Sequence, residues 1–302
     1  MIKLRIPATS ANIGPGFDSI GLAVNLYNHV TMEEADSCQI SSLDGIPVPT
    51  DETNLIYSTA KQLYHICGVP FYGMKIEQIN NIPFARGLGS SSACVIAGLK
   101  GANTLLGNPV SDAELINIAA SIEGHPDNST PALVGGLVTA AMEGDKVYFV
   151  KQEIKTDLHF VTIIPDFELK TSQARSVLPD RIDRKDGVFN LSRAALMSVS
   201  LYSGNYQNLR VAADDRIHQP YRLGLIKGGE AVMQACYHLG AYAAFISGAG
   251  STLMAIVDAN LNDFGDCIAR RLPELGLYGW RVHTLSIDNV GTQIINEAEN
   301  GK

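Results

Sequence analysis

A glycine- and serine-rich segment, placed between a strand pattern and a helix pattern, most constrains how this chain can fold. Residues 83–93 read Pro-Phe-Ala-Arg-Gly-Leu-Gly-Ser-Ser-Ser-Ala; the alternating run Met74–Ile79 precedes them, and a helix is expected over Ser91–Leu106. Such a turn aims backbone N–H groups at one point, where the positive end of the helix dipole adds to them. Serine hydroxyls supply further donors. The segment is therefore predicted to bind a polyphosphate.

Two familiar nucleotide-binding motifs are absent from the sequence. The chain has no G-x-x-x-x-G-K-[ST] pattern, so the segment is not a Walker A loop. Gly87 and Gly89 lack the third glycine of a dinucleotide fingerprint. The phosphate-binding prediction therefore depends on the local chemistry of the segment and on its neighbours.

Composition excludes several classes of partner. The net charge of −8 disfavours nucleic acid and anionic membranes, and no apolar stretch is long enough to cross a bilayer. The length of 302 residues, 46% of them hydrophobic, suits two domains or one large α/β unit. The five cysteines contain no C-x-x-C pair, which favours reduced thiols and a cytoplasmic location.

Periodicity divides the first half of the chain into short strands and amphipathic helices. Ser111 and Glu114 form a capping-box pattern at the start of one helix. Strands are expected at Ile2–Pro7, Ile20–Leu26, Val30–Glu33, Gln39–Ser41 and Met74–Ile79, helices at Leu55–Cys67, Ser91–Leu106 and Ser111–Ile122, and a hairpin over Gly135–Met142 and Lys146–Val150.

The pattern starts again near residue 155, so domains are expected at residues 1–155 and 156–302. The second half has β-α-β-β-α-β character, which predicts an α+β fold. Strands are expected at His159–Pro165, Ala243–Ser247, Thr252–Val257 and Arg281–Ile287, and helices at Val188–Ser203, Tyr206–Ala213, Leu223–Leu239 and Asn262–Leu275.

Three glycine-containing loops stand at strand edges, at residues 7–18, 83–93 and 247–252. Alone, each could be a simple turn. In this order and spacing they resemble the three motifs of the GHMP kinase superfamily. The resemblance implies a two-domain GHMP kinase fold. Its N-terminal domain would be an α/β domain like the second domain of ribosomal protein S5, with a left-handed-type crossover, and its C-terminal domain a ferredoxin-like split β-α-β domain.

Further segments resemble the homoserine kinase family within that superfamily. They are Glu-Gly-His-Pro-Asp-Asn at 123–128, Thr-Ser-Gln-Ala-Arg at 171–175 and Asp-Arg-Ile-His-Gln-Pro-Tyr-Arg at 215–222. The sequence departs from the family pattern at Ser251, where proline is common, and at 129–130, where small apolar residues are usual. The resemblance implies an ATP- and Mg²⁺-dependent enzyme of threonine biosynthesis that phosphorylates the hydroxyl of L-homoserine.

The resemblance also implies residues for the ATP half of a site. The amides and hydroxyls of Gly87–Ser92 would surround the β- and γ-phosphates, and Ser91 and Glu123 would be Mg²⁺ ligands. Ser91 could instead be a helix cap, and Glu123 an exposed acid near a helix end. The expected cofactor-binding residues are Asn54, Pro83, Phe84, Ala85, Arg86, Gly87, Leu88, Gly89, Ser90, Ser91, Ser92 and Ala93.

For the acceptor half, an amino-acid alcohol brings an ammonium, a carboxylate and a reacting hydroxyl. Arg175 and Arg222 would clamp the carboxylate. Asn12 and Asp18, the expected catalytic residues, would hold the hydroxyl, with Asp18 a candidate base; local turn capping is the alternative for both. The remaining substrate-binding residues would be His125, Asp127, Asn128, Thr171 and Gly248.

Two alternatives stay open from the sequence. Another small-molecule kinase of the same fold would act on mevalonate or a sugar, and a sugar needs no arginine clamp. A non-catalytic ligand-binding protein could also use this fold, although Asn12, Asp18, Ser91 and Glu123 argue against it. The sequence leaves the oligomeric state undecided, with a homodimer as one candidate.

Overall fold

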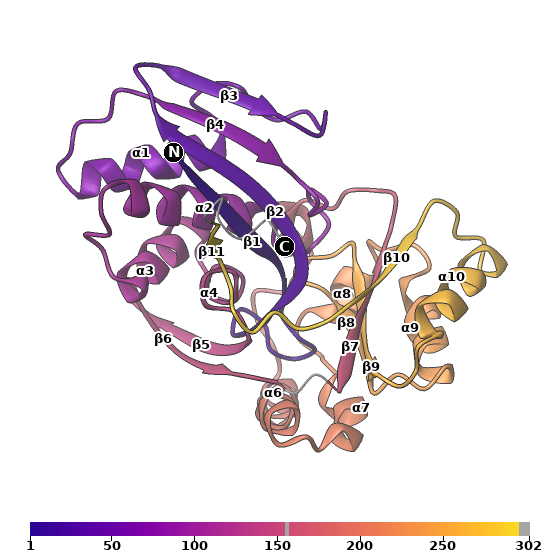
Figure 1. The fold of residues 1–302 in the computed structure, drawn as a ribbon. Coiled ribbons are helices and arrows are strands. Elements are labelled where there is room, and N and C mark those ends of the chain that lie inside the picture. The colour runs from indigo at the N-terminus through magenta and orange to yellow at the C-terminus, as the bar shows by residue number, and fades with distance from the viewer. Residues whose placement is uncertain (155–156, 296–302) are drawn as a thin grey trace.

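Two β-sheets, each packed against helices, form the two halves of the molecule (Figure 1). The computed structural model describes residues 1–154 and 157–295. The predicted domain boundary between residues 155 and 156 lies outside the described residues. Within the described parts, no helix is both long and apolar enough to cross a membrane.

The first sheet has the strand order β11-β1-β2-β4-β3, and β5 extends it from β2 and pairs with β6. Strands β3 and β4 run parallel and are connected through α1, whereas the other pairs are antiparallel. The strands are β1 (Ile2–Ala11), β2 (Ile20–Glu34), β3 (Cys38–Ser42), β4 (Met74–Ile79), β5 (Leu137–Glu143), β6 (Lys146–Gln152) and β11 (Gln293–Ile294).

Helices α1 (Leu55–Ile66), α2 (Ser90–Leu105), α3 (Asp112–Glu123) and α4 (Ser129–Val134) accompany this sheet (Figure 1). The predicted capping box is present: the hydroxyl of Ser111 accepts from the Glu114 N–H, and the Glu114 carboxylate accepts from the Ser111 N–H. Helix α2 carries small residues where it packs between α1 and β1, which brings its N-terminus close to the end of that strand.

The second sheet is antiparallel, with the order β10-β7-β9-β8. This is the strand order of a ferredoxin-like split β-α-β unit. Its strands are β7 (Leu158–Ile164), β8 (Ala243–Ile246), β9 (Leu253–Asp258) and β10 (Arg281–Leu285), and its packing helices are α9 (Gly229–His238) and α10 (Phe264–Glu274). The other elements are α5 (Thr171–Ser176), α6 (Arg184–Ser203), η1 (Tyr206–Asn208), α7 (Leu209–Ala212) and α8 (Gln219–Leu223).

Several predicted boundaries were wrong, each for a local reason. Strand β2 is one continuous strand, because its polar middle still pairs with β1 beside a bulge at Pro7 and Ala8. The helix predicted over Leu223–Leu239 begins only at Gly229, since Gly228 caps it with φ of +81°. The helix predicted over Tyr206–Ala213 is η1 followed by α7, and β1 extends to Ala11.

The segment after β10 returns to the first sheet. The Asn25 N–H donates to Ser286 O at 3.0 Å, the Asp288 N–H donates to Ala23 O at 2.9 Å, and β11 then pairs with β1. Figure 1 shows this segment crossing from β10 back to β1. Residues from near the end of the described sequence therefore complete the first sheet.

Candidate active site

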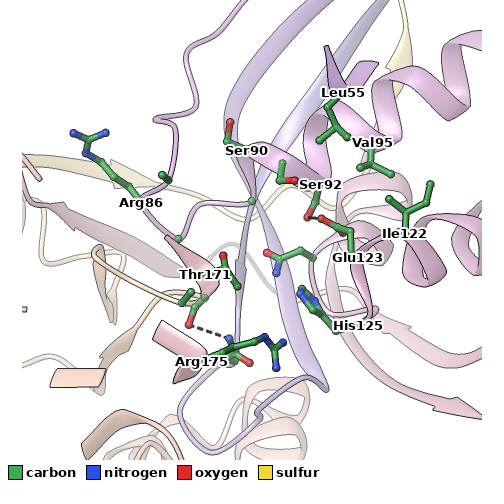
Figure 2. Close-up of a pocket in the computed structure, with 18 of the residues that line it drawn as sticks. Leu55, Arg86, Ser90, Ser92, Val95, Ile122, Glu123, His125, Thr171 and Arg175 are labelled. Atoms are coloured by element: carbon green, nitrogen blue, oxygen red, sulfur yellow. Dashed lines mark hydrogen bonds between the residues drawn. The ribbon is translucent and has the colours of Figure 1, made fainter. Parts of the chain in front are cut away.

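The three glycine-containing loops meet between the two sheets. Ser247 Oγ donates to Gly87 O at 2.7 Å, the Thr9 N–H donates to Leu88 O at 3.2 Å, and the Gly248 N–H donates to Ala11 O at 2.9 Å. A cavity of about 390 Å³ opens there (Figure 2). Its walls come from Asn12, Leu55, Ala85, Arg86, Gly87, Gly89, Ser90, Ser91, Ser92, Val95, Ile122, Glu123, His125, Asn128, Thr171, Arg175, Arg222, Gly248 and Ala249.

Close contacts with the other two loops explain two glycines of the second loop. Gly87 has φ of +74°, and a Cβ added there would lie 2.1 Å from Ser247 O. Gly89 has φ of +69°, and its added Cβ would lie 1.9 Å from Thr9 Oγ1. A side chain at either position would therefore separate the loops that form the cavity.

One end of the cavity is rich in hydrogen-bond donors. Gly89 is the N-cap of α2 and offers no side chain, and the first backbone bond of the helix runs from the Ala93 N–H to Gly89 O. The N–H groups of Ser90, Ser91 and Ser92 have no acceptor within the helix. Ser90 Oγ is also buried without a partner among the described residues. This end therefore suits an anion.

Glu123 lies beside that helix end, at the last position of α3. Its Oε1 accepts from Ser92 Oγ at 2.6 Å, and its Oε2 is buried with no partner in the described part of the chain. Burial raises the pKa of Glu123 to about 7, although the Ser92 hydrogen bond opposes the shift. Ser91, the predicted metal ligand, lines the cavity with an exposed side chain, whereas Ser92 contacts Glu123 (Figure 2).

At the other end, the first loop holds Asn12 and Asp18 in left-handed backbone conformations, with φ of +56° and +52°. Asn12 Oδ1 accepts from the Asp18 N–H at 2.8 Å, and Asn12 Nδ2 donates to Gly248 O at 2.9 Å. Arg175 donates to both carboxylate oxygens of Asp18, at 2.7 and 3.1 Å. The expected hydroxyl-binding and carboxylate-binding residues are therefore paired with each other.

Arg222 is 1% exposed and forms no ion pair with a carboxylate of residues 1–154 or 157–295. Its Nε donates to Ala174 O at 3.2 Å and its Nη1 to Gly248 O at 3.1 Å. Burial and the charge of Arg175 lower the pKa of Arg222 to about 10. A buried cation that faces a cavity without a carboxylate partner suits an anionic ligand.

His125, Asp127 and Asn128 follow α3 and line or support the same cavity. His125 Nδ1 lies 2.7 Å from Asp127 Oδ1, and Asp127 is fully buried. Burial lowers the pKa of His125, but the hydrogen bond and charge of Asp127 outweigh this, so the pKa is raised. Asn128 Oδ1 accepts from Thr9 Oγ1 at 2.9 Å. Ligand atoms of Asp18, His125 and Asp127 lie within 4.8 Å of one another.

Some predicted cofactor residues do not line the cavity. The Asn54 side chain caps α1, since it accepts from the Ile56 N–H at 3.0 Å and donates to Pro49 O at 2.9 Å. Arg86 does line the cavity wall, but its guanidinium donates to three backbone carbonyls. The other predicted residues outside the cavity wall are Asp18, Pro83, Phe84, Leu88, Ala93 and Asp127.

Sequence reasoning missed an apolar wall. Leu55, Val95 and Ile122 line the cavity near the start of α2 (Figure 2). They lie on α1, α2 and α3, and no cavity-lining role was predicted for them. No sequence signal separates these three positions from their buried neighbours.

Known protein families and relatives that are similar to this chain agree with this arrangement. Residues 54–136 match the family model of the GHMP kinases N-terminal domain, and residues 197–273 match that of the GHMP kinases C-terminal domain. A homoserine kinase from Clostridium beijerinckii is 46% identical over 98% of this chain and 99% of its own length. The chain belongs to the homoserine kinase family of the GHMP kinases. A homoserine kinase from Caldicellulosiruptor saccharolyticus, 42% identical over 98% of this chain and 97% of its own, agrees with that membership.

Solved structures extend the homoserine kinase likeness to three dimensions. A homoserine kinase from Cytophaga hutchinsonii superposes with a TM-score of 0.88 at 28% identity, covering 97% of both chains. A mevalonate kinase, 16% identical with a TM-score of 0.67 over 95% of this chain and 99% of its own, shares the fold. The predicted family and the two-domain GHMP kinase fold are therefore confirmed.

Proposed function

We propose that this chain transfers the γ-phosphoryl group of ATP to the side-chain hydroxyl of L-homoserine, giving O-phospho-L-homoserine on the route to threonine. The observation that carries the proposal is the presence of two anion-binding groups at opposite ends of one cavity. The donor-rich start of α2 lies at one end, and the buried Arg222, which has no carboxylate partner in the described parts, lies at the other. The first suits phosphate, and the second suits the carboxylate of an amino acid.

In the ATP half, the N–H groups of Ser90, Ser91 and Ser92 would bind phosphate oxygens. The α2 dipole would add to their effect, because it places partial positive charge at the same point. Gly87 and Gly89 let the loop approach without side chains in the way. These groups are fixed before ATP binds, so they would stabilise the charge that develops on the transferring phosphoryl group.

Mg²⁺ fits the residues beside this loop. Glu123 Oε2 is buried and has no partner among the described residues, and the Ser91 hydroxyl faces the same cavity. A hard cation prefers such oxygen donors. We propose that Ser91 and Glu123 hold Mg²⁺, which when bound neutralises negative charge on the phosphates.

In the acceptor half, an amino-acid zwitterion would replace the ion pair between Arg175 and Asp18. Its carboxylate would bind Arg222 and Arg175, and its ammonium would lie near Asp18, which Arg175 neutralises in the structure. Asn12 and Asp18 would orient the hydroxyl, with Asp18 available to accept its proton as the O–P bond forms. His125, held by Asp127, would line the substrate position, as would Asn128, Thr171 and Gly248.

Release of ADP tests the proposal directly. The protein is incubated with ATP and Mg²⁺ and, separately, with L-homoserine, mevalonate, galactose or shikimate. Of the four acceptors, we expect only L-homoserine to cause release of ADP. Release with mevalonate or galactose would support another kinase of this fold, and no release with any of the four would support a ligand-binding protein.

We also propose that the protein is cytoplasmic and assembles as a homodimer. All five cysteines are unpaired, which suits a reducing compartment. Helix α6 exposes apolar side chains at helical spacing, namely Val188, Leu191, Val199 and Tyr202, which are 61–73% exposed. A second copy of α6 would cover them. Light scattering at micromolar concentration tests this, and a monomer that persists up to the millimolar range would rule it out.

A further inference from the structure

A buried histidine that plays no part in the scheme above connects the two ends of the acceptor site. His218 is 0% exposed and is the residue directly before α8. Its Nε2 lies 2.6 Å from Gly14 O, and its Nδ1 lies 3.4 Å from Arg222 Nη1. Its ring centroid is 5.3 Å from that of Phe17. The histidine thus contacts both the first loop and the arginine.

The two hydrogen-bond partners determine the tautomer of His218, whereas the Asp215 carboxylate lies farther away, with its Oδ2 3.6 Å from Nε2. A carbonyl oxygen can only accept and a guanidinium can only donate, so Nε2 carries the proton and Nδ1 is the acceptor. Burial and the charge of Arg222 lower the pKa of His218, against opposing effects of Asp215, the Gly14 carbonyl and Asp18. The ring is therefore neutral, as the two hydrogen bonds require.

These contacts close a ring of hydrogen bonds. Gly248 O accepts from both Asn12 Nδ2 and Arg222 Nη1, at 2.9 and 3.1 Å. Arg222 donates onward to His218, and His218 donates to Gly14, two residues beyond Asn12. The backbone of Gly14 packs closely against Ala213, since a Cβ added at Gly14 would lie 2.9 Å from Ala213 Cα. The position of the arginine relative to the first loop is therefore fixed through His218.

We propose that His218 is a positioning residue that sets the distance between Arg222 and the loop carrying Asn12 and Asp18. One substrate molecule must reach both, because its carboxylate binds the arginine and its hydroxyl binds the loop. The inference rests on the proposed function. It adds that the neutral imidazole of His218 fixes the distance between Arg222 and the first loop. This distance in turn limits the length of the acceptor substrate that fits.

Two near-isosteric variants separate the two contacts. In His218→Gln the amide can occupy the Nε2 position and still donate to Gly14, but the acceptor for Arg222 is lost. In His218→Asn the amide oxygen can occupy the Nδ1 position and still accept from Arg222, but the bond to Gly14 is lost. We expect the first to raise the KM for homoserine by roughly tenfold with little change in kcat. The second should lower kcat by roughly tenfold, because the first loop is released.

The KM for ATP should stay within about twofold in both variants, since α2 and the second loop are untouched. His29→Gln, on β2 and outside the cavity wall, is the matched control and should behave like the parent protein. Parent-like constants in both His218 variants would overturn the proposal. So would a parallel rise of the KM for ATP, or failure of both variants to fold, because either marks a merely structural residue. A parent protein that does not phosphorylate homoserine would instead refute the proposed function.

Discussion

Arg222 shows at the scale of one residue how a buried charge limits what a cavity can bind. Its guanidinium bridges Ala174 O and Gly248 O and still faces the cavity. We expect Arg222→Lys to raise the KM for homoserine on the order of 100-fold, because an ammonium cannot hold both carbonyls and a carboxylate in one plane. Steady-state kinetics with each substrate varied in turn measures this.

The KM for ATP is the internal control in that experiment and should change little. Arg271→Lys, in an exposed ion pair with Glu274, is the matched substitution and should have no kinetic effect. Equal increases in both KM values would show that Arg222 supports the whole cavity and not the carboxylate alone.

Glu123 should make the stability of the free protein depend on pH. Burial raises its pKa from 4.5 to about 7 in the folded protein. Between pH 4.5 and about 7 the folded protein keeps a proton that the unfolded chain has lost, so the free energy of unfolding falls as pH rises through this window. Glu123→Gln should lack this part of the decline. Urea unfolding at pH 5 and pH 8, without nucleotide or Mg²⁺, compares the two proteins; identical declines would contradict the assignment.

At the scale of an element, glycines at the two ends of α2 test whether ATP binding depends on the close contact between α2 and the first loop or on backbone strain. Gly89 and Gly107 flank the helix with φ of +69° and +81°. An alanine at either costs about 1 kcal/mol of stability, from the left-handed backbone. Only at Gly89 would the new Cβ also meet Thr9, whereas nothing lies within 4 Å of one at Gly107. Gly89→Ala should therefore raise the KM for ATP on the order of tenfold or more, and Gly107→Ala should not.

Nucleotide titration followed by calorimetry provides a second readout for this pair. The Gly107→Ala protein should bind ATP like the parent, despite its lower melting temperature. Weakened ATP binding in both variants would mean that loss of helix stability, and not the contact with the first loop, accounts for the effect.

The elements themselves were predictable to different degrees. Helix α3 was predicted well because the capping-box residues Ser111 and Glu114 mark its start. The β5–β6 hairpin was predicted because apolar and polar residues alternate along its strands. The short elements α4, α5, α8 and β11 were missed, since a helix of five or six residues has fewer than two turns in which to show a period and β11 has only two residues. Among site residues, loop glycines and arginines stand out in the sequence. His218 lies in the segment 215–222 that was singled out, but its role was not predicted, because it depends on Gly14, 204 positions away, as well as on Arg222, four positions away.

At the scale of the whole molecule, Arg86 links the two sheets. Its guanidinium donates to Pro165 O at 3.1 Å and Asp166 O at 2.9 Å, beyond β7, and to Phe84 O at 3.0 Å in its own loop. Arg86→Ala should lower the free energy of unfolding by about 2 kcal/mol, because three carbonyls lose a charged donor. It should raise the KM for both substrates, since the cavity has walls from both halves.

Denaturant unfolding and steady-state kinetics on the same preparation check this prediction. Arg271→Ala removes an exposed ion pair and serves as the comparison, with an expected change within about 0.5 kcal/mol. A variant of Arg86 with parent-like stability and kinetics would show that the other contacts between the two halves hold them together without Arg86.

The return of β11 to β1 has a consequence for how the protein forms in the cell. Strand β1 is synthesised long before β11, yet among the described residues the strand that pairs with the β1 edge away from β2 is β11, through Gln293 and Ile294, with a further bond from the Ile295 N–H to Lys3 O. Until those residues emerge, that edge offers unpaired N–H and C=O groups to any other nascent strand. During synthesis the ferredoxin-like half emerges while the first sheet is still incomplete. A chain truncated before β11 should therefore associate more readily than the chain that includes it.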